Sequence, residues 1–277
     1  MAKTLTETQV LDLQTKAKAI RRNIVKMITE AKSGHPGGSL SAADILTTLY
    51  FAEMNVDPQN PKDENRDRFV LSKGHAAPVL YATLAAKGYF AEEELMSLRQ
   101  VNTRVQGHPS MKDLPGIDMS TGSLGQGLSA ANGMALASRL DGKTNRVFVL
   151  MGDGELEEGM IWEAAMLAGH YKLSNVTAFV DYNGLQIDGP VEKVLSPLPL
   201  AEKWRAFQWN VIEIDGHDIP AIYEAIQTAK AETEKPTVIL AKTVKGKGVS
   251  FMENQAGWHG NAPSKEQCEQ ILAEDLA

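Results

Sequence analysis

The spacing of apolar residues predicts alternating helices and strands along most of the chain. From Val10 to Ala31, apolar residues recur every three or four positions with charged residues between them, which is the pattern of an amphipathic helix. Short apolar runs bounded by polar or turn residues predict strands. The expected helices cover 10–31, 78–87, 124–140, 160–171, 219–231 and the polar tail 264–277, with one more starting at Ser41 as its cap; the expected strands cover 68–71, 147–151, 176–180, 211–214 and 237–241.

The order of these elements indicates the fold class. Helices and strands alternate from residue 124 onward, which favours an α/β fold with a mostly parallel sheet and helices on both of its faces. The stretches 100–122 and 184–199 are rich in glycine and proline and are expected to be long connections. Because the sequence shows no internal repeat and no linker, we expect a single domain over residues 1–277.

The composition of the chain excludes several classes of protein. The chain has 35 acidic and 28 basic residues, a net charge of -7, so its overall charge does not favour nucleic acid. No apolar run approaches the roughly 18 residues of a membrane helix, and the polar amino terminus lacks a signal-peptide core. The single cysteine, Cys268, excludes a disulfide framework and a cysteine-rich zinc site. We therefore expect a soluble, cytoplasmic protein that binds neither nucleic acid nor membrane.

Oxygen-bearing side chains follow two neighbouring predicted strands. Asp153, between Gly152 and Gly154, comes directly after strand 147–151, and Asn183 comes shortly after strand 176–180. In one right-handed β-α-β unit both residues emerge at the carboxyl edge of the sheet. A carboxylate and an amide oxygen suit Mg²⁺, and flanking glycines admit a diphosphate. Each residue alone could also serve an ordinary turn, with Asp153 as a helix cap and Asn183 in an Asx-turn.

A second candidate for anion binding is the segment 120–127, which leads directly into a predicted helix whose free amides attract phosphate. The letters of residues 125–130 match the dinucleotide fingerprint G-x-G-x-x-A. That fingerprint requires a preceding strand and an acidic residue at the end of the next strand, and neither is present here. The match therefore does not indicate NAD binding.

Four of the six histidines lie in loops beside small residues: His35, His75, His108 and His259. A single loop histidine is usually a surface residue, but four with glycine neighbours suggest a shared cavity where imidazoles bind phosphate or polyol oxygens and move protons. Their spacing is not that of a histidine-bound metal site. We interpret His170 and His217 as structural.

Taken together, these motifs resemble those of transketolase, a family of thiamine diphosphate enzymes. The Gly-Asp-Gly unit followed by Asn183 is similar to the diphosphate-binding motif of thiamine diphosphate enzymes in general. The resemblance covers nearly the whole chain in both motif content and order. The motifs specific to transketolase are 33–37 (SGHPG), 72–75 (SKGH), 107–109 (GHP), 121–127 (TGSLGQG) and 258–260 (WHG).

The resemblance implies roles for particular residues. Asp153, Asn183 and the carbonyl of Leu185 would hold Mg²⁺, or Ca²⁺ or Mn²⁺ in its place. The histidines of the four loops, His35, His75, His108 and His259, would line the substrate channel as catalytic groups. The residues implied to contact thiamine diphosphate are His75, Gly122, Ser123, Leu124, Asp153, Gly154, Asn183, Ile187 and His259.

Three further residues relate this chain to the family pattern. Glu158 and Glu163 resemble the acidic residues that bridge the two active sites of a transketolase dimer, although both also suit the solvated face of a helix beginning near residue 157. Ser123 stands where many transketolases have proline, which should affect the stiffness of the loop more than its chemistry.

The length of the chain, compared with that of a full transketolase, implies that it supplies only half of an active site. A full transketolase continues into a pyrimidine-binding domain and a carboxyl-terminal domain, which supply the activating glutamate and most of the groups for the sugar phosphate. We therefore expect the amino-terminal subunit of a split transketolase, which works with a carboxyl-terminal subunit in a heterotetramer of two copies of each. The complex would transfer a two-carbon ketol unit from a ketose phosphate to an aldose phosphate, in carbohydrate metabolism of the pentose phosphate type.

Two other functions remain open from the sequence. The Gly-Asp-Gly unit also fits the diphosphate-binding chain of a 2-oxoacid dehydrogenase, or deoxyxylulose-phosphate synthase. The four histidine loops favour a polyol substrate over these alternatives. A non-catalytic cofactor-binding module is the alternative from a different functional class.

Overall fold

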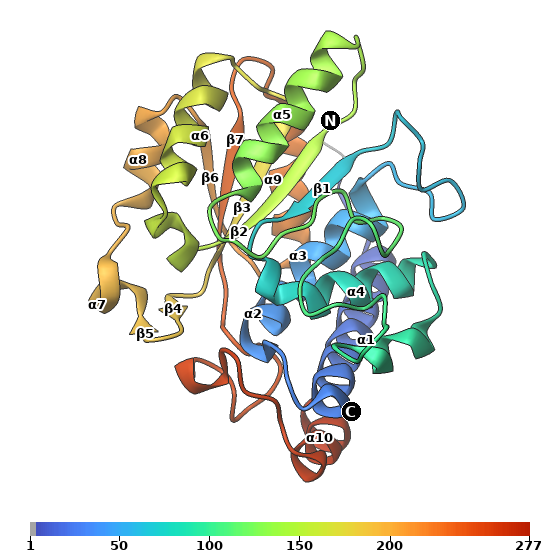
Figure 1. Ribbon diagram of the computed structural model, residues 1–277. Coiled ribbons are helices and arrows are strands. Elements are labelled where there is room, and N and C mark those ends of the chain that lie inside the picture. Colours follow the sequence, from blue (N-terminus) through green and yellow to red (C-terminus); the bar gives the residue numbers. More distant parts are fainter. Residues whose placement is uncertain (1–3) are drawn as a thin grey trace.

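A five-stranded sheet forms the centre of the molecule (Figure 1). The computed structural model describes residues 4–277 of the chain. The strand order is β1-β2-β3-β7-β6, and every neighbouring pair is parallel. A short antiparallel pair, β4 with β5, follows β3. The strands are β1 (Arg68–Leu71), β2 (Val147–Gly152), β3 (Val176–Tyr182), β4 (Leu185–Gln186), β5 (Gly189–Pro190), β6 (Asn210–Asp215) and β7 (Thr237–Lys242).

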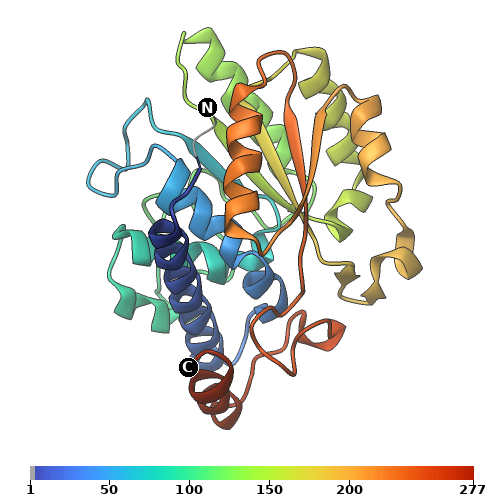
Figure 2. The ribbon, with the colours of Figure 1, turned by 180° about the vertical axis from the view of Figure 1, so that it is seen from behind.

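Helices cover both faces of this sheet, as Figures 1 and 2 show from opposite sides. The α/β class and the parallel sheet predicted from the sequence are thereby confirmed. The α-helices are α1 (Glu7–Ala31), α2 (Pro36–Ser41), α3 (Ala43–Thr48), α4 (Ala77–Lys87), α5 (Gly127–Leu140), α6 (Gly159–His170), α7 (Val191–Leu195), α8 (Leu200–Ala206), α9 (Ile219–Ala231) and α10 (Lys265–Gln270). Shorter 3-10 or π turns are η1 (Leu49–Glu53), η2 (Gly74–Ala76), η3 (Glu92–Ser97), η4 (Gly154–Glu157), η5 (Ala256–Trp258) and η6 (Ile271–Asp275).

Side chains alternate between two hydrophobic cores, one on each face of the sheet. Phe148 and Leu150 of β2 pack with helices α1, α3, α4 and α9, whereas Val147, Val149 and Met151 pack with α5, α6 and α8. Successive residues of a strand point to opposite faces, so a strand that is apolar throughout is buried on both. Burial on both faces explains why the residues of β2 and β3 are mostly hydrophobic. Because the two strands are parallel, their carboxyl ends lie at the same edge of the sheet.

The helix predicted to start at Ser41 is α3, which begins at Ala43 with Ala42 as its cap, and a separate short helix, α2, precedes it. Ser41 is not the cap of α3 but the last residue of α2, which starts at Pro36 after His35. Proline at the first helical position has its φ already set for a helix. The hydroxyl of Ser41 donates instead to Oδ2 of Asp181 at 2.6 Å, so a contact 140 residues away decides its role.

Two other boundaries differ from the expectations. The helix expected from 124 begins at Gly127, because residues 123–126 form a turn with Gly125 at a positive φ of 84°. The connection 184–199 contains β4, β5 and α7, which its glycine and proline content did not predict. Residues 100–122 have neither helix nor strand, as expected.

Within residues 4–277, no helix combines the length and the apolar character that crossing a bilayer would require.

Candidate active site at the carboxyl edge of the sheet

The parallel strands β2 and β3 place Asp153 and Asn183 at the same edge of the sheet. The two strands pair in register from Val147 opposite Val176 to Gly152 opposite Asp181, so the next residues leave the sheet side by side. The Asp153 carboxylate accepts a hydrogen bond from the amide of Gly184, the neighbour of Asn183. Both predicted ligands therefore lie within one small region, and both line the same cavity.

The oxygens of these residues make local hydrogen bonds. Oδ1 of Asp153 accepts from the amide of Gly154 at 2.8 Å, and Oδ1 of Asn183 accepts from the amide of Leu185 at 3.1 Å. The carbonyl of Leu185 accepts from Nζ of Lys245 at 3.0 Å. The cap and the Asx-turn considered from the sequence are thus both present.

A cavity of about 310 Å³ opens at this edge. Its wall combines main chain at glycines with two lysines, two carboxylates and two imidazoles. The lining residues are Gly38, Lys73, His75, Gly122, Leu124, Gly152, Asp153, Gly154, Glu155, Asn183, Leu185, Gln186, Ile187, Lys245 and His259.

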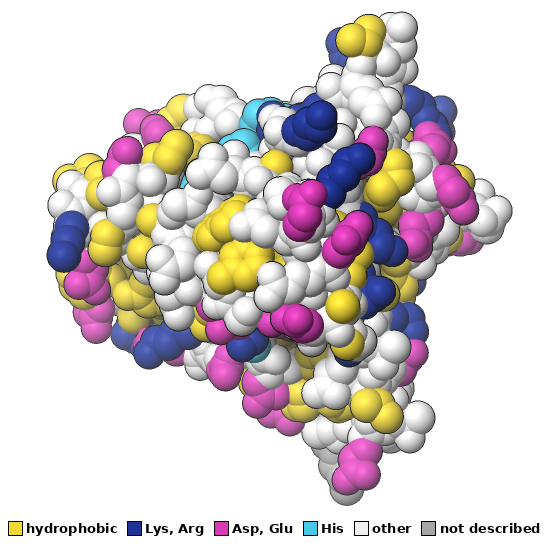
Figure 3. Space-filling view, turned by 90° about the horizontal axis from the view of Figure 1, so that it is seen from below, with side chains coloured by type: hydrophobic (Ala, Val, Ile, Leu, Met, Phe, Trp, Pro, Cys, Tyr) yellow, Lys and Arg dark blue, Asp and Glu magenta, His cyan; other side chains and the backbone are white. Residues whose placement is uncertain are grey.

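The four loop histidines cluster beside this cavity. The ring of His35 lies 5.3 Å from that of His75, 5.5 Å from that of His259 and 6.5 Å from that of His108. The rings of His75 and His259 stack at 5.1 Å. Figure 3, which views the molecule from below, shows histidine side chains together at the surface of this face, next to a basic side chain. Loops separated by up to 224 positions, the difference between 259 and 35, thus meet at one place.

These imidazoles are held neutral. Burial first and the charge of Lys73 next keep the pKa of His75 well below its usual value. Burial and then Lys245 lower the pKa of His259 to about 3, while burial and then Arg99 lower the pKa of His35 to about 4. Neutral imidazole has one N–H donor and one acceptor nitrogen, which suits hydroxyl groups.

A buried ion pair forms the floor of the cavity. Nζ of Lys73 contacts Asp181, and both side chains are almost fully buried. Asp181 also accepts from Ser41 and Thr243, and Lys73 donates to the carbonyl of Gly38 at 2.8 Å. Burial raises the pKa of the Asp181 carboxyl, but Lys73 and the donors around it outweigh burial, so that pKa is lowered overall.

The charges of Asp153 and Lys245, which face the cavity, are less well compensated than those of the pair Lys73 and Asp181. Burial first and Asp181 next raise the pKa of Asp153 to about 6, against the amides of Gly184 and Gly154. Burial and then Lys73 lower the pKa of Lys245 to about 8. The charges of Asp153 and Lys245 act on each other, but neither group forms an ion-pair contact within residues 4–277, and both line one cavity. Such a cavity suits a cation bound together with an anionic ligand.

Unpartnered polar atoms also fit a ligand here. Within residues 4–277, Nδ1 of His259 and Oγ1 of Thr121 are buried without a hydrogen-bond partner. A side chain in place of Gly74 would lie 2.7 Å from Oγ1 of Thr121, and one in place of Gly122 would lie 3.2 Å from the His108 ring. Buried polar groups normally have partners, so Nδ1 of His259, a residue of the cavity wall, fits a polar ligand in this cavity.

A cation at this site would need oxygen ligands. Over the described range 4–277, no group of three or more His, Cys, Asp or Glu side chains is arranged to hold a metal ion. The available set is the carboxylate of Asp153, the amide oxygen of Asn183 and the carbonyl of Leu185, together with oxygens of a bound ligand. Such an incomplete set of hard oxygen donors fits Mg²⁺ bound to a diphosphate.

The other predicted residues occupy the rim or the surface. Ile187 lines the cavity with its side chain 66% exposed, and Leu124 lines it as well. Ser123 is exposed and does not line the cavity. Glu158 and Glu163 are both exposed in the single chain. His217 bridges Asp44 and the amide of Val244, each at 2.8 Å, which agrees with the structural role inferred for it.

Sequence reasoning missed several groups that form the site. Glu155 is buried and accepts from the hydroxyl of Ser72 and from the amides of Gly125 and Gly152 at 2.9 and 3.0 Å, so it ties three loops together. Lys245 follows β7, which pairs with β3. The signal that identified Asp153 and Asn183, a polar residue just beyond a parallel strand, applies equally to Lys245.

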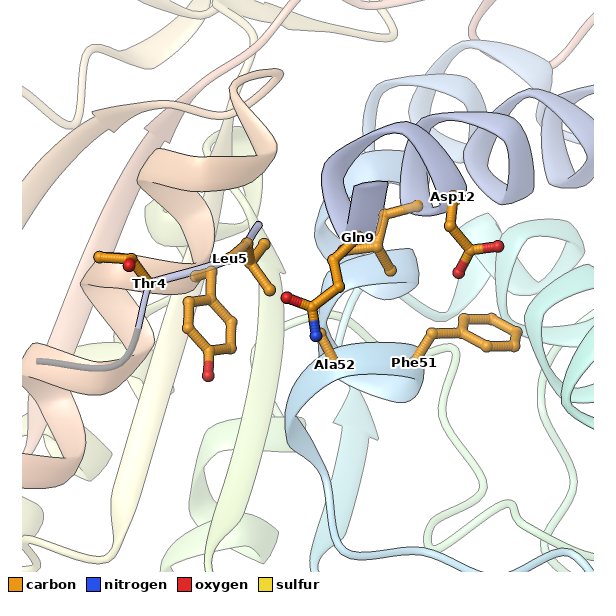
Figure 4. A pocket seen from close by; sticks show the side chains of 8 residues that line it. Thr4, Leu5, Gln9, Asp12, Phe51 and Ala52 are labelled. Atoms are coloured by element: carbon orange, nitrogen blue, oxygen red, sulfur yellow. The ribbon is translucent and has the colours of Figure 1, made fainter. Parts of the chain in front are cut away.

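A larger cavity of about 450 Å³ lies elsewhere, where α1 begins between η1 and α9 (Figure 4). Its lining includes Gln9, Asp12 and Phe51, with Asp12 as the ionisable carboxylate and no histidine or lysine. Because Asp12 already pairs with Lys16 and, among the described residues, no other carboxylate, histidine or lysine lines this cavity, we do not regard it as the active site.

Comparison with known proteins identifies the family. The family model described as the thiamine diphosphate binding domain of transketolase matches residues 13–274. The chain belongs to the transketolase family. The resemblance found from the sequence motifs and the predicted class of cofactor, thiamine diphosphate, are therefore confirmed.

Some curated transketolase relatives have the same length as this chain and are named as subunits. The 6-deoxy-6-sulfo-D-fructose transketolase subunit SqwG of Clostridium sp. is 48% identical over 96% of this chain and 97% of its own length. An apulose-4-phosphate transketolase subunit of Phocaeicola vulgatus is 43% identical over 96% of this chain and 94% of its own. Full human transketolase is 42% identical, but the match covers 42% of it.

Solved transketolases share this fold. The transketolase of Pichia stipitis in complex with sedoheptulose 7-phosphate gives a TM-score of 0.91 at 35% identity, covering 96% of this chain and 41% of that one. The transketolase of Campylobacter jejuni gives 0.91 at 35% identity, covering 96% and 43%. The chain thus spans about two fifths of the solved transketolases that it resembles.

Proposed function

We propose that this chain is the amino-terminal, thiamine diphosphate-binding subunit of a two-chain transketolase. In this proposal it transfers a two-carbon ketol unit from a ketose phosphate, or a similar anionic ketose, to an aldose phosphate. The observation that carries the proposal is the cluster of four neutral histidines at the mouth of the cavity that holds Asp153 and Asn183. Relatives that are matched over nearly their whole length and named as transketolase subunits support it.

We assign the cofactor to the 310 Å³ cavity. Asp153, Asn183 and the Leu185 carbonyl would hold Mg²⁺, and the diphosphate would supply its remaining ligands. His75, His259, Gly154, Gly122 and Leu124, which line this cavity, would contact the cofactor, with Ile187 against its thiazolium ring, whereas Ser123 of the same turn lies outside the cavity wall. We add Lys245, whose ammonium lies at the same wall and forms no ion-pair contact within residues 4–277.

Bound thiamine diphosphate supplies the nucleophilic carbon and the electron sink for cleaving the ketose. The chain's own groups position the sugar and move protons. His35, His108 and His259 would bind hydroxyls of the sugar, each with one donor and one acceptor nitrogen. Because these imidazoles are neutral near pH 7, each keeps a ring nitrogen that can accept a hydrogen bond from the hydroxyl that becomes a carbonyl.

The missing half of the site implies a partner. We propose that a separate chain with the pyrimidine-binding domain completes a heterotetramer of two copies of each subunit, with Glu158 and Glu163 near the junction of the two sites. The family match over residues 13–274 supports one diphosphate-binding domain for the whole of residues 1–277. A cytoplasmic location and a role in sugar phosphate metabolism complete the proposal.

Reconstitution with the partner tests the function. The two chains, with thiamine diphosphate and Mg²⁺, would be assayed with fructose 6-phosphate, xylulose 5-phosphate, apulose 4-phosphate, 6-deoxy-6-sulfofructose and pyruvate as donors. We expect turnover with at least one ketose and none with pyruvate. Turnover with pyruvate alone would instead support a 2-oxoacid dehydrogenase or a deoxyxylulose-phosphate synthase type of enzyme.

The same assay addresses a non-catalytic role. His35→Ala and His259→Ala should each reduce turnover strongly while the two chains still assemble, because the histidines touch the substrate. If neither substitution changes turnover, or if no donor is converted, a cofactor-binding module becomes the better description.

A further inference from the structure

Arg99 lies between two of the histidine loops, and the family motifs do not include it. It follows η3, where its backbone has a positive φ of 61° and its amide donates to the carbonyl of Val105 at 3.0 Å. Left-handed backbone is unfavourable for a residue with a long side chain. The loop therefore holds Arg99 in a costly conformation, and such strain often occurs at functional sites.

The guanidinium of Arg99 reaches both loops. Nη1 donates to Oγ of Ser33 at 3.0 Å, and Nη2 lies 3.5 Å from Nδ1 of His35. On its other side the guanidinium packs against Gly107, where an added Cβ would lie 3.1 Å from Nε and 3.2 Å from Cζ. One side chain thus joins residues 33–35 to residues 107–108, which are more than 70 positions apart in the sequence.

The charge of Arg99 is not used in an ion pair. Other arginines of this chain contact carboxylates: Arg21 contacts Asp44, Arg66 contacts Asp118 and Arg104 contacts Glu94. Among the ion pairs of residues 4–277, none involves Arg99. A guanidinium whose neighbours are a hydroxyl, an imidazole and a glycine is placed to orient those groups and to act on them by its charge.

The contact also favours one tautomer of His35. Guanidinium nitrogens only donate hydrogen bonds, so the 3.5 Å contact favours Nδ1 of His35 as the acceptor, with the ring proton on Nε2. Nε2 lies on the side of Gly260, where an added Cβ would be 3.6 Å away, and Gly260 directly follows His259, whose ring lies 5.5 Å from that of His35. His35 can then offer a defined N–H to a ligand in the histidine cluster.

We propose that Arg99 is a positioning residue of the substrate channel, which clamps the loops of His35 and His108 together and presents Nε2–H of His35 as a donor to a sugar hydroxyl. This inference rests on the proposed function, because it takes the histidine cluster as the sugar-binding channel. Arg99 acts through the two histidines and needs no contact with the sugar.

Electrostatics agree with this geometry. Burial and then the charge of Arg99 lower the pKa of His35 and that of His108. The other groups that act on His35 are His108 and Lys245, and its ring also faces His75 and His259. Lys245 is the other cationic group that acts on His35, so the pKa of His35 stays partly lowered when Arg99 is removed.

The test compares three variants. Arg99→Met removes the charge and the donors but keeps the length of the side chain, and Arg99→Lys keeps the charge but loses the planar fork. Arg104→Met is the control, because Arg104 lies in the same loop with an exposed partner, Glu94. Long-range ¹H–¹⁵N spectra of the full chain would report the tautomer and the pKa of His35, and thermal melts would show whether each variant is folded.

We expect Arg99→Met to raise the pKa of His35 by about half a unit or more and to abolish its tautomer preference. In the reconstituted enzyme, kcat should fall by about tenfold or more, with a small change in KM, and the acidic limb of the kcat/KM profile should move to higher pH. Arg99→Lys should lower kcat without moving that limb, and Arg104→Met should match the parent. Should Arg99→Met not fold, Arg99→Lys still separates the outcomes through the tautomer of His35, which the lysine should not fix.

Two results would overturn the inference. An unchanged tautomer and pKa of His35 in a folded Arg99→Met or Arg99→Lys variant would show that Arg99 does not position it. A rise in KM for phosphorylated donors with an unchanged kcat would show that Arg99 binds the substrate's anion directly. Failure of the proposed function is distinct, because then no ketose is converted while the spectra of His35 still respond to Arg99.

Discussion

Asp153 is the residue on which cofactor binding depends most directly. Its carboxylate is buried at the carboxyl end of β2, where burial and the nearby Asp181 raise its pKa. Asp153→Asn keeps the shape of the side chain but removes the negative charge that a divalent cation requires. We expect Mg²⁺-dependent affinity for thiamine diphosphate to fall by at least about tenfold, the lower end of losses at metal sites.

Titration calorimetry with thiamine diphosphate, with and without Mg²⁺, measures this effect. The matched control is Asp141→Asn, which changes an exposed carboxylate outside the cavity and should bind as the parent does. Equal affinities for the parent and Asp153→Asn would remove Asp153 from the metal site.

Protonation of the histidine cluster should destabilise the cofactor-free chain. Burial, followed by Arg99 and Lys245 respectively, lowers the pKa of His35 to about 4 and that of His259 to about 3. An unfolded histidine titrates near 6.5, so below that pH the unfolded chain binds protons that the folded chain does not. The contribution of these two neutral histidines to the free energy of unfolding is therefore complete above pH 6.5. It is lost as the pH falls toward about 4 for His35 and toward about 3 for His259.

Urea unfolding at several values of pH between 7.5 and 4 would measure this loss. The double variant His35→Gln, His259→Gln should show a shallower decline of the free energy of unfolding, because glutamine does not titrate. Parallel curves for the parent and the variant would show that these histidines do not cause the decline.

At the scale of elements, the start of α5 depends on the absence of a side chain at Gly127. A Cβ at this position would lie 2.5 Å from Cβ and 2.8 Å from Cα of Ser72, whose hydroxyl contacts Glu155. We expect Gly127→Ala to lower the free energy of unfolding by about 1–3 kcal/mol, because α5 must move away from β1 and the Glu155 network. Chemical denaturation would measure the change.

Gly133 offers a control on the same helix. A Cβ there meets nothing within 4 Å, so Gly133→Ala should raise the free energy of unfolding by about 0.5–1 kcal/mol through helix propensity alone. If both substitutions have the same effect, the close approach of α5 to Ser72 does not determine stability.

At the scale of the whole molecule, histidine side chains reach the surface in the view from below (Figure 3), and two histidines of the cluster line the cavity. The apolar side chains of Ile187, Val194 and Leu195 are exposed, and they lie in the segment 187–195, which begins at the wall of the cavity. These features agree with a partner that covers the site. We expect light scattering of the reconstituted enzyme to give the mass of two copies of each chain, and turnover only in that species. Turnover by this chain alone would contradict the proposal.

The sequence by itself determined the α/β fold, the motif loops and the edge at which Asp153 and Asn183 meet. This was possible because hydrophobic period and chain order are local signals, and a parallel crossover brings the ends of consecutive strands to the same edge. The small residues beside four histidines suggested a shared cavity, and the family motifs then implied the roles of these histidines, but neither gave the distances between them.

Only the tertiary structure showed how Lys245, Glu155, Ser41 and Arg99 belong to the site. Lys245 reaches Leu185 because β7, and not β6, pairs with β3, and no local pattern reports that strand order. The contact of Ser41 with Asp181, and that of Arg99 with Ser33 and His35, likewise joins residues more than 60 positions apart. Such contacts depend on how the elements pack, so they become visible only when the fold is known.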